Sequence, residues 1–178
     1  FGGSLGAHHL NETIFELSQK WEGEPICIYH IVGSRDWQDF SQFERNSAGN
    51  VEYEMIEYLE DLTPLIGAAD LVISRAGATS VSEITALGIP SILVPLPNSP
   101  SNHQEENARF FEKEGSAVVV MDSELNYVSL SNRISLLFKE DLILNEMRKK
   151  AKNSRRLTAG DKIADLISNI INGGFDAK

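Results

Sequence analysis

The sequence predicts an α/β fold with a doubly wound parallel sheet, and three observations lead to that prediction. Short apolar runs rich in β-branched residues alternate with longer amphipathic segments along most of the 178 residues. The apolar runs are continuous, as in strands that helices cover on both faces. Strands and helices that alternate in this way are typical of βαβ units in one sheet. The length suits about one domain, and the chain contains no internal repeat.

Five segments have the composition of buried strands, because β-branched and apolar side chains fill a pleated surface that helices cover. The clearest is residues 26–32, which reads Ile-Cys-Ile-Tyr-His-Ile-Val and ends at Gly33. The segment 51–56 is weaker, since acidic side chains interrupt it. The other three predicted strands are residues 70–74, 91–94 and 117–120.

Helical spacing of apolar residues predicts seven helices before, between and after these strands. The polar and acidic stretch 34–50 is expected to hold a further short helix and loops, with no domain boundary. The chain after residue 130 is expected to be helical. The seven segments are residues 10–20, 62–68, 80–87, 104–114, 130–138, 142–152 and 161–171.

The composition limits the class of protein and of partner. Apolar residues make up 42% and charged residues 24% of the chain, which excludes wholesale disorder. Sixteen Lys and Arg against 26 Asp and Glu give a net charge of −10. This charge argues against broad nucleic-acid binding, which needs clustered basic side chains. We therefore expect no nucleic-acid partner.

The sequence also indicates a compartment. The single cysteine, Cys27, cannot form an intrachain disulfide, which favours a reducing compartment. The most apolar stretches, 89–96 and 117–121, are much shorter than the roughly 20 residues of a membrane span. We expect no transmembrane segment. The chain starts at Phe1 without an initiator Met or a charged signal region, and we expect it to be a piece of a longer protein.

A first glycine-rich segment, residues 2–7, precedes the first helix and reads Gly-Gly-Ser-Leu-Gly-Ala. Glycines allow a tight turn and a close approach of the backbone to a ligand, and the helix N-terminus behind them favours anions. A plain strand-to-helix turn is one alternative. The nucleophile elbow of an α/β serine hydrolase is a more remote one, with Ser4 as nucleophile, Asp70 as acid and His103 as base. That elbow normally follows several strands, and here none precedes it.

A second segment, residues 75–83, follows the predicted strand 70–74 and reads Arg-Ala-Gly-Ala-Thr-Ser-Val-Ser-Glu. Small residues at the carboxyl end of a strand are found where ligands bind to open α/β sheets. Two interpretations of Glu83 remain open from the spacing. It could form a capping box with Ser80, or its carboxylate could accept hydrogen bonds from a ribose diol.

A third segment, residues 95–108, is a proline-rich loop that leads into a helix. His103, Gln104 and Asn107 lie in the first turns of that helix, and His103 and Asn107 share one of its faces. An imidazole and neutral amides suit the recognition of sugar hydroxyls. The alternative is a set of polar residues on an exposed first turn.

Other polar residues are interpreted as structural. His8 and His9, with Asn11 and Glu12 after them, do not form a convincing set of metal ligands, so we predict no metal and no other cofactor. His30 is expected to be a hydrogen-bonded histidine of the core. The basic run 148–156 is expected to form a solvated helix face.

Together the three segments resemble the MurG family of N-acetylglucosaminyltransferases, which act in bacterial peptidoglycan synthesis. Segments 2–7, 69–83 and 103–108 occur in the order and spacing of that family, and the resemblance extends to about residue 171. It is a resemblance to the C-terminal, donor-binding half of a two-domain, GT-B type glycosyltransferase with Rossmann-like halves. It implies a UDP-sugar-binding domain over residues 1–172, a tail over 173–178, and an N-terminal acceptor domain that this chain lacks.

The resemblance also implies a binding site for UDP-N-acetylglucosamine. The glycine-rich segment 2–7 would lie near the nucleotide and the diphosphate, and the start of the following helix at 78–80 would bind the diphosphate. Glu83 would bind the ribose hydroxyls. Met55 and Ile56, placed on a loop after the weak strand, would lie against the uracil. The expected substrate-binding residues are Gly3, Ser4, Gly6, Ile56, Gly77, Ala78, Thr79, Ser80, Glu83, His103, Gln104 and Asn107.

The implied reaction is an inverting transfer of N-acetylglucosamine from UDP to a lipid-linked N-acetylmuramyl-pentapeptide. The catalytic base and the acceptor site are expected in the missing half, so no catalytic residue is assigned here. This chain is expected to bind the donor without turnover. The whole enzyme is expected on the cytoplasmic face of the membrane, attached through its other half. A UDP-sugar-binding subunit of a two-chain or other lipid glycosyltransferase is the alternative.

Two features depart from the family pattern. Position 5 is Leu, where many relatives carry a polar residue. The strand that should precede Gly2 is absent, although in this architecture it would lie near the middle of the sheet. We expect that strand upstream of Phe1 in the complete protein.

Overall fold

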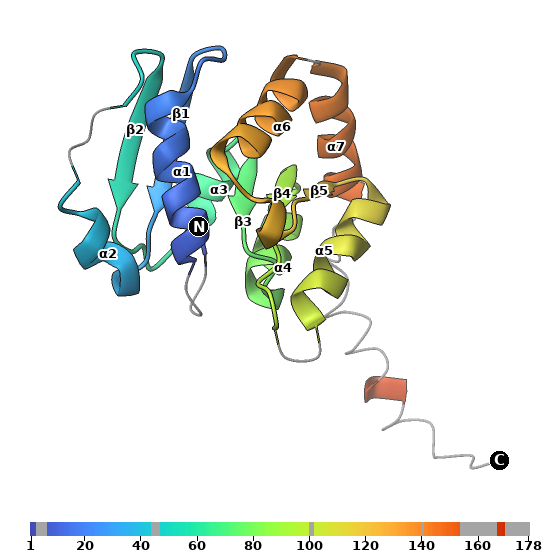
Figure 1. Cartoon of the computed structure of the whole chain (residues 1–178). Helices are drawn as coiled ribbons and strands as arrows, with labels where there is room; N and C mark the ends of the chain where they lie inside the picture. Colours follow the sequence, from blue (N-terminus) through green and yellow to red (C-terminus); the bar gives the residue numbers. More distant parts are fainter. Residues whose placement is uncertain (3–6, 44–46, 100–101, 140, 154–166, 170–178) are drawn as a thin grey trace.

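The fold is α/β, and all its strands run parallel to their partners (Figure 1). The computed structural model describes residues 1–2, 7–43, 47–99, 102–139, 141–153 and 167–169. Each of the five predicted strands is present in this part of the chain. They are β1 (Ile26–Ile31), β2 (Val51–Ile56), β3 (Val72–Ser74), β4 (Ser91–Leu93) and β5 (Ala117–Val119).

The described strands form two sheets. β1 pairs with β2, and Ile26 lies opposite Val51. The other sheet has the order β3-β4-β5, and Ser91 of β4 lies between Val72 and Ala117. β1 and β3 do not pair, although each presents an edge toward the other across a groove between the sheets.

Helices follow the strands as the sequence predicts, including a short one after β1. They are α1 (His8–Lys20), α2 (Ser34–Phe40), α3 (Thr63–Ala68), α4 (Ala78–Leu87), α5 (His103–Glu114), α6 (Tyr127–Lys139) and α7 (Asp141–Asn153), with a 3₁₀ turn η2 at Asp122–Glu124. Residues 167–169 are also helical, and the rest of the predicted helix 161–171 lies outside the described residues.

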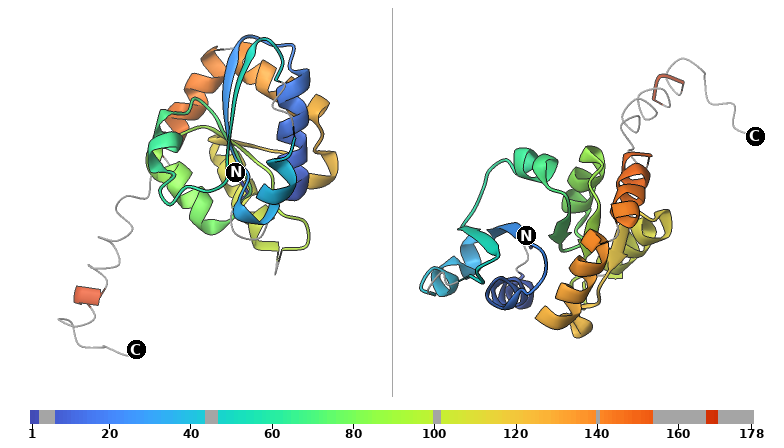
Figure 2. Two further views of the ribbon diagram at one scale, coloured as in Figure 1. Left: turned by 90° about the vertical axis from the view of Figure 1, so that its left-hand side faces the viewer. Right: turned by 90° about the horizontal axis from the view of Figure 1, so that it is seen from above.

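The core has one layer on each face of the three-stranded sheet, because neighbouring strand residues point to opposite faces. Ile92 packs with apolar residues of α1 and α6, whereas Leu93 packs with α3, α4 and α5. On α1 the buried residues Leu10, Ile14 and Leu17 recur at helical spacing. Figure 2 shows the helices on both sides of the strands.

Helix α7 packs against α6 and α4 and reaches the amino end of the three-stranded sheet. Arg148 of α7 donates a 2.9 Å hydrogen bond to the carboxylate of Asp70, just before β3. Lys149 pairs instead with Glu146, on its own helix. The basic run of the sequence is therefore partly engaged with carboxylates. No helix in the described ranges has both the length and the apolar character needed to cross a bilayer.

Helix α6 begins at Tyr127, three residues before its predicted start. The carboxamide of Asn126 accepts a 2.9 Å hydrogen bond from the amide of Ser129, and the Ser129 hydroxyl accepts one from the amide of Asn126. This reciprocal cap satisfies backbone donors at the helix start and explains the earlier boundary.

Candidate functional site

The candidate site lies at the carboxyl ends of β3 and β4, where ligands bind in open α/β sheets. Residues 75–77 turn from β3 into α4, and residues 94–102 connect β4 to α5. The described parts of these connections and the starts of α4 and α5 lie at the lower side of Figure 1.

The N-terminus of α4 is suited to an anion. Its N-cap, Gly77, has an extended conformation, and no side chain caps the first turn or places a negative charge in it. The first amides of a helix have no intrahelical partners, so those of Ala78, Thr79 and Ser80 are available to a ligand. A Cβ atom added at Gly77 would meet nothing within 4 Å, so the backbone there is approachable.

Glu83 lies one turn into α4 and is exposed. No hydrogen bond or ion pair joins its carboxylate to another residue within the described part of the chain. The alternative interpretation of Glu83, a capping box with Ser80, does not hold, because α4 begins at Ala78 and Ser80 lies inside the first turn rather than at the N-cap. The Glu83 carboxylate is free to accept hydrogen bonds from a ligand.

Two amide side chains of α5 bind the loops around this helix start. The Gln104 carbonyl oxygen accepts a 3.0 Å hydrogen bond from the amide of Leu96, and the Asn107 amide donates a 3.1 Å bond to the carbonyl of Ala76. The Gln104 NH₂ group and the Asn107 carbonyl oxygen remain for a ligand. His103 is exposed beside them. The predicted residues of α4 and α5 therefore lie on connected parts of one site.

The sequence predicts no role for Arg75, which is buried next to this site and hydrogen-bonded to the residues that follow β4 and β5. Arg75 donates 2.5 and 3.4 Å bonds to the Asp122 carboxylate and to the Val94 carbonyl, and the other Asp122 oxygen lies 3.1 Å from Nδ1 of His9. Burial alone would raise the pKa of Asp122, but the hydrogen bonds from Arg75 and His9 lower it. These contacts join the ends of β3 and β5 to the start of α1.

A second buried network joins α1, β1 and α2. The Asn11 amide donates to the Val32 carbonyl at 3.0 Å and to the Asp36 carboxylate at 2.8 Å, and its oxygen lies 3.0 Å from His30 Nε2. His30 Nδ1 lies 2.7 Å from the Tyr53 hydroxyl. Burial, followed by the nearby α-amino group, lowers the pKa of His30 to about 3. The interpretation of His30 as a hydrogen-bonded core residue is confirmed.

Other predicted residues are not joined to this cluster by a described contact. Gly3, Ser4 and Gly6 lie outside the described residues. Met55 and Ile56 were expected on a loop, but they are the last two residues of β2, and Met55 is buried. The Ile56 carbonyl accepts a 2.9 Å bond from the Val32 amide, which extends the pairing with β1 to this point. Ile56 is thus at the carboxyl end of the other sheet.

The residues proposed for a hydrolase do not form a triad. Asp70 precedes β3 and pairs with Arg148, whereas His103 follows β4 and lies at the carboxyl end of the sheet. Parallel strands place these two positions at opposite ends. Within the described ranges, no group of three or more His, Cys, Asp or Glu residues could hold a metal ion.

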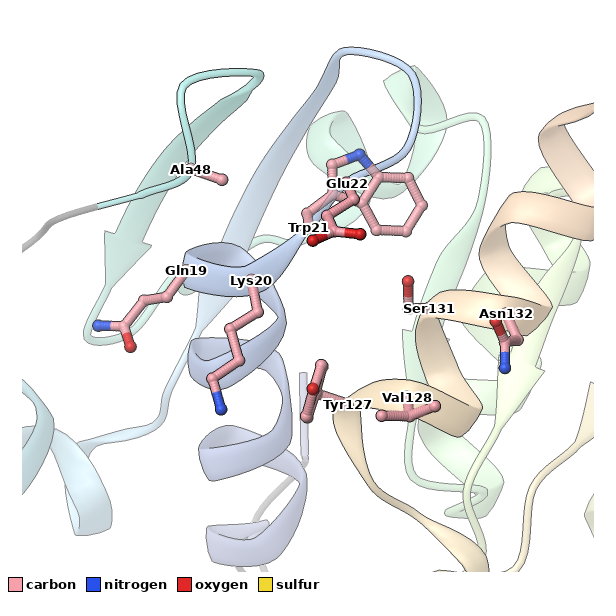
Figure 3. Close-up of a pocket in the computed structure, with 9 residues that line it drawn as sticks. All are labelled: Gln19, Lys20, Trp21, Glu22, Ala48, Tyr127, Val128, Ser131 and Asn132. Atoms are coloured by element: carbon pink, nitrogen blue, oxygen red, sulfur yellow. The ribbon is translucent and has the colours of Figure 1, made fainter.

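A cavity of about 670 Å³ lies between the end of α1 and the start of α6, and Figure 3 shows the residues that line it. Lys20 lies beside the ring of Tyr127, with its ammonium 4.6 Å from the ring centroid. None of the predicted substrate-binding residues lines this cavity. The candidate site is instead an exposed surface formed by α4, α5 and their preceding loops.

Comparison with known proteins identifies relatives of the whole chain. Residues 1–165 match the glycosyltransferase family 28 C-terminal domain. Two curated relatives bear the name UDP-N-acetylglucosamine--N-acetylmuramyl-(pentapeptide) pyrophosphoryl-undecaprenol N-acetylglucosamine transferase. The one from Desulforudis audaxviator is 35% identical over 98% of this chain and 48% of its own length. The one from Caldanaerobacter subterraneus is 38% identical over 95% of this chain and 47% of its own.

Solved structures agree with this result. A crystal structure of MurG from Acinetobacter baumannii matches 96% of this chain and 48% of its own, with a TM-score of 0.80 and 29% identity. The rhamnosyltransferase SpnG, at 15% identity and a TM-score of 0.64, shares the fold alone. The chain spans about half the length of the curated relatives it matches.

Proposed function

The chain belongs to the family of glycosyltransferase family 28 C-terminal domains, and from this membership we propose that it is the donor-binding half of an N-acetylglucosaminyltransferase of peptidoglycan synthesis. The donor is UDP-N-acetylglucosamine, and the acceptor is a lipid-linked N-acetylmuramyl-pentapeptide bound by the other half. Both substrates are named in the curated relatives. The whole enzyme would work at the cytoplasmic face of the membrane.

The observation that carries this proposal is the uncapped N-terminus of α4 with a free carboxylate one turn later. The amides of Ala78, Thr79 and Ser80 would bind the diphosphate. Glu83 would accept hydrogen bonds from the two ribose hydroxyls. A nucleoside diphosphate carries anionic phosphates next to a ribose diol. One such ligand can therefore contact the α4 amides with its phosphates and Glu83 with its diol.

The sugar would contact α5. Because the Gln104 oxygen and the Asn107 NH₂ group are already bonded to the protein, Gln104 would donate to a sugar hydroxyl and Asn107 would accept from one. His103 would lie against the same sugar. Gly3, Ser4 and Gly6 complete the proposed site by resemblance, beside the diphosphate, and Ile56 would contact the uracil.

In the proposed reaction the acceptor hydroxyl attacks the anomeric carbon of N-acetylglucosamine. The bond from that carbon to the diphosphate breaks, UDP leaves, and the configuration at the anomeric carbon is inverted. Negative charge grows on the diphosphate as that bond breaks. The α4 amides are already oriented, so they would stabilise this charge without reorganisation. This chain would position the donor, and the base that takes the hydroxyl proton would come from the other half.

We expect UDP-N-acetylglucosamine to stabilise the folded chain. At about 100 times its dissociation constant, a ligand adds about 2.7 kcal/mol to the free energy of unfolding. Thermal unfolding would be measured with UDP-N-acetylglucosamine, UDP-glucose and ATP, on the parent chain and on Glu83→Ala. A rise in the unfolding temperature with UDP-sugars that is absent in Glu83→Ala supports the proposal. The difference between the shifts with UDP-N-acetylglucosamine and UDP-glucose reports which sugar the chain prefers.

Glu22→Ala is the matched control, because Glu22 is an exposed glutamate outside the proposed site. It should retain the full shift. Equal shifts in the parent chain and in Glu83→Ala would remove Glu83 from the site. A folded parent chain that shows no shift with any UDP-sugar would contradict donor binding by this half.

A further inference from the structure

The bond between Arg75 and Asp122 spans the end of the larger sheet at which the candidate site lies. Arg75 follows β3 and Asp122 comes shortly after β5, and these are the two outer strands of the order β3-β4-β5. Arg75 also donates to the carbonyl of Val94, directly after the central strand β4. One side chain thus joins the segments that follow all three strands at their carboxyl ends.

The position of the Arg75 guanidinium depends on Asp122. The Arg75 side chain is 5% exposed, and Asp122 is the one carboxylate that pairs with it within the described part of the chain. Its buried Nε atom has no hydrogen-bond partner there, so the bonds of Nη1 hold the group. A buried charge that loses its counter-charge is strongly unfavourable. The Arg75 side chain therefore stays where the Asp122 carboxylate is.

The turn that leads from β3 into α4 begins at Arg75. The Ala76 side chain is buried, but a Cβ atom added at Gly77 would meet nothing within 4 Å, so close packing ends before the helix begins. Hydrogen bonds hold the turn from both faces of the sheet. Asn107 of α5 donates to the Ala76 carbonyl on one face, and Arg75 reaches Asp122 on the other. The first amides of α4 directly follow this turn.

The other oxygen of Asp122 contacts the start of α1. It lies 3.1 Å from Nδ1 of His9, in the first turn of that helix. No side chain caps α1 and no acidic residue lies in its first turn, and the same is true of α4. Asp122 is thus connected to the starts of two helices whose first amides have no side-chain cap, directly to α1 and through Arg75 to α4.

We propose that Asp122 is a positioning residue for the donor. Through Arg75 it fixes the turn 75–77, so that the first amides of α4 are oriented for a diphosphate before the ligand binds. Through His9 it holds the start of α1 against this turn. The inference rests on the proposed function, because it concerns the same site and ligand. A binding group that is misplaced by about 1 Å loses much of its interaction, so such supporting contacts are needed.

An ion pair that only stabilises the fold would have a different signature. Its loss would change the affinity for every ligand alike, or for none. The proposed role concerns the amides that bind phosphate, so it affects the gain in affinity from UMP to UDP, which differ by one phosphate group. Removal of the Asp122 charge alone would act in the opposite direction, since it removes repulsion from an anion.

The test measures the binding of UMP and UDP by titration calorimetry to the parent chain and three variants. Asp122→Asn keeps an oxygen that can accept from Arg75 but removes the charge. Asp122→Glu keeps the charge and moves the carboxylate by one methylene. Asp70→Asn is the matched control, because Asp70 accepts a 2.9 Å bond from Arg148 at the opposite end of β3. Circular dichroism reports whether each chain is folded.

We expect Asp122→Asn to bind UDP at least about tenfold more weakly than the parent, and the gain from UMP to UDP to shrink by a similar factor. Asp122→Glu should lose part of this gain although its charge is unchanged, so the test also holds if Asp122→Asn does not fold. Asp70→Asn should retain the gain of the parent.

Unchanged or tighter binding of UDP by folded Asp122→Asn would overturn the proposal and leave Asp122 with a role in stability alone. Equal losses of affinity for UMP and UDP would overturn it too, as would the full gain in Asp122→Glu if Asp122→Asn does not fold. A parent chain that binds no UDP would contradict the proposed function and this inference together. A parent that binds UDP beside unaffected Asp122 variants would contradict this inference alone.

Discussion

At residue 30 an imidazole is enclosed by the core, 3% exposed, with both ring nitrogens in hydrogen bonds. Its partners, Tyr53 and Asn11, lie on β2 and α1, and Asn11 in turn reaches β1 and α2. One neutral histidine therefore connects most of the elements around the smaller sheet. Protonation would place a charge among them without a carboxylate in direct contact.

We predict that His30 makes the fold sensitive to acid. Its pKa in the folded chain is about 3, against 6.5 as the reference value for the unfolded chain. The folded state thus binds the proton more weakly, and stability that is complete above pH 6.5 falls as the pH drops below it. Between pH 7 and pH 5 the free energy of unfolding should fall by about 2 kcal/mol from this group.

Urea unfolding at the two pH values would measure this loss. His30→Gln should have a much smaller difference between pH 7 and pH 5, although it is less stable at pH 7. His103→Gln, at an exposed position, should keep the parent's difference. If His30→Gln retained the full pH dependence, the loss would belong to other groups.

The environment of a single residue could be predicted from the sequence where its immediate neighbours in the chain determine it. A histidine inside an apolar β-branched run has few options other than a buried, hydrogen-bonded position, and His30 has that position. Arg75 and Asp122 show the opposite case. The two residues are 47 positions apart in the sequence and follow different strands. No local pattern around either residue encodes their contact. The same holds for Asn107, whose partner Ala76 is on another loop.

At the scale of elements, α4 differs from its prediction by two residues. The first turn contains Ala78 and Thr79, whose propensities do not specify a start, and the spacing of Ser80 and Glu83 imitates a cap. The structure starts the helix directly after Gly77 and leaves the turn without a side-chain cap. The start of α6 moved for a similar reason, because the Asn126 cap decided a boundary that composition left open, whereas β2 has its predicted bounds.

We predict that Gly77→Ala separates binding from folding. The backbone at Gly77 has a φ of −62° and a ψ of 145°, which alanine adopts readily, and the space for a Cβ is empty. The free energy of unfolding should change by less than about 1 kcal/mol. A methyl group at the helix start would, however, obstruct the approach of a diphosphate to the α4 amides.

The measurement is the thermal shift with UDP-N-acetylglucosamine, which should fall to a small fraction of the parent's. Gly67→Ala is the matched control, since a Cβ there also meets nothing within 4 Å and the residue lies on α3, outside the proposed site. Normal donor binding by a well-folded Gly77→Ala chain would show that the ligand does not approach this turn.

At the scale of the whole molecule, the α/β class and the parallel strands followed from the alternation of strand and helix patterns. The separation into two sheets did not follow from the composition of the strands. It depends on which edges find partners in space, which a single sequence does not display. The resemblance to the MurG family supplied the expectation of a strand before Gly2, and that strand stays a prediction.

We predict that the 178-residue chain binds the donor but does not transfer the sugar, since it spans about half of its relatives and carries no assigned base. The test incubates the chain with radiolabelled UDP-N-acetylglucosamine and a lipid-linked N-acetylmuramyl-pentapeptide. A full-length relative is the positive control. Radioactivity in the lipid fraction above that of a Glu83→Ala sample would contradict this division of labour between the halves.

The hydrogen bonds of Gln104 and Asn107 have a consequence for the heat and entropy of binding. They hold the loop at Leu96, the turn at Ala76 and helix α5 as one unit before any ligand arrives. A ligand that enters such a preorganised surface does not have to immobilise it, so little conformational entropy is lost in the protein on association. Loosening either bond would leave the contact atoms in place and still weaken affinity, through an unfavourable change in the entropy of binding alone.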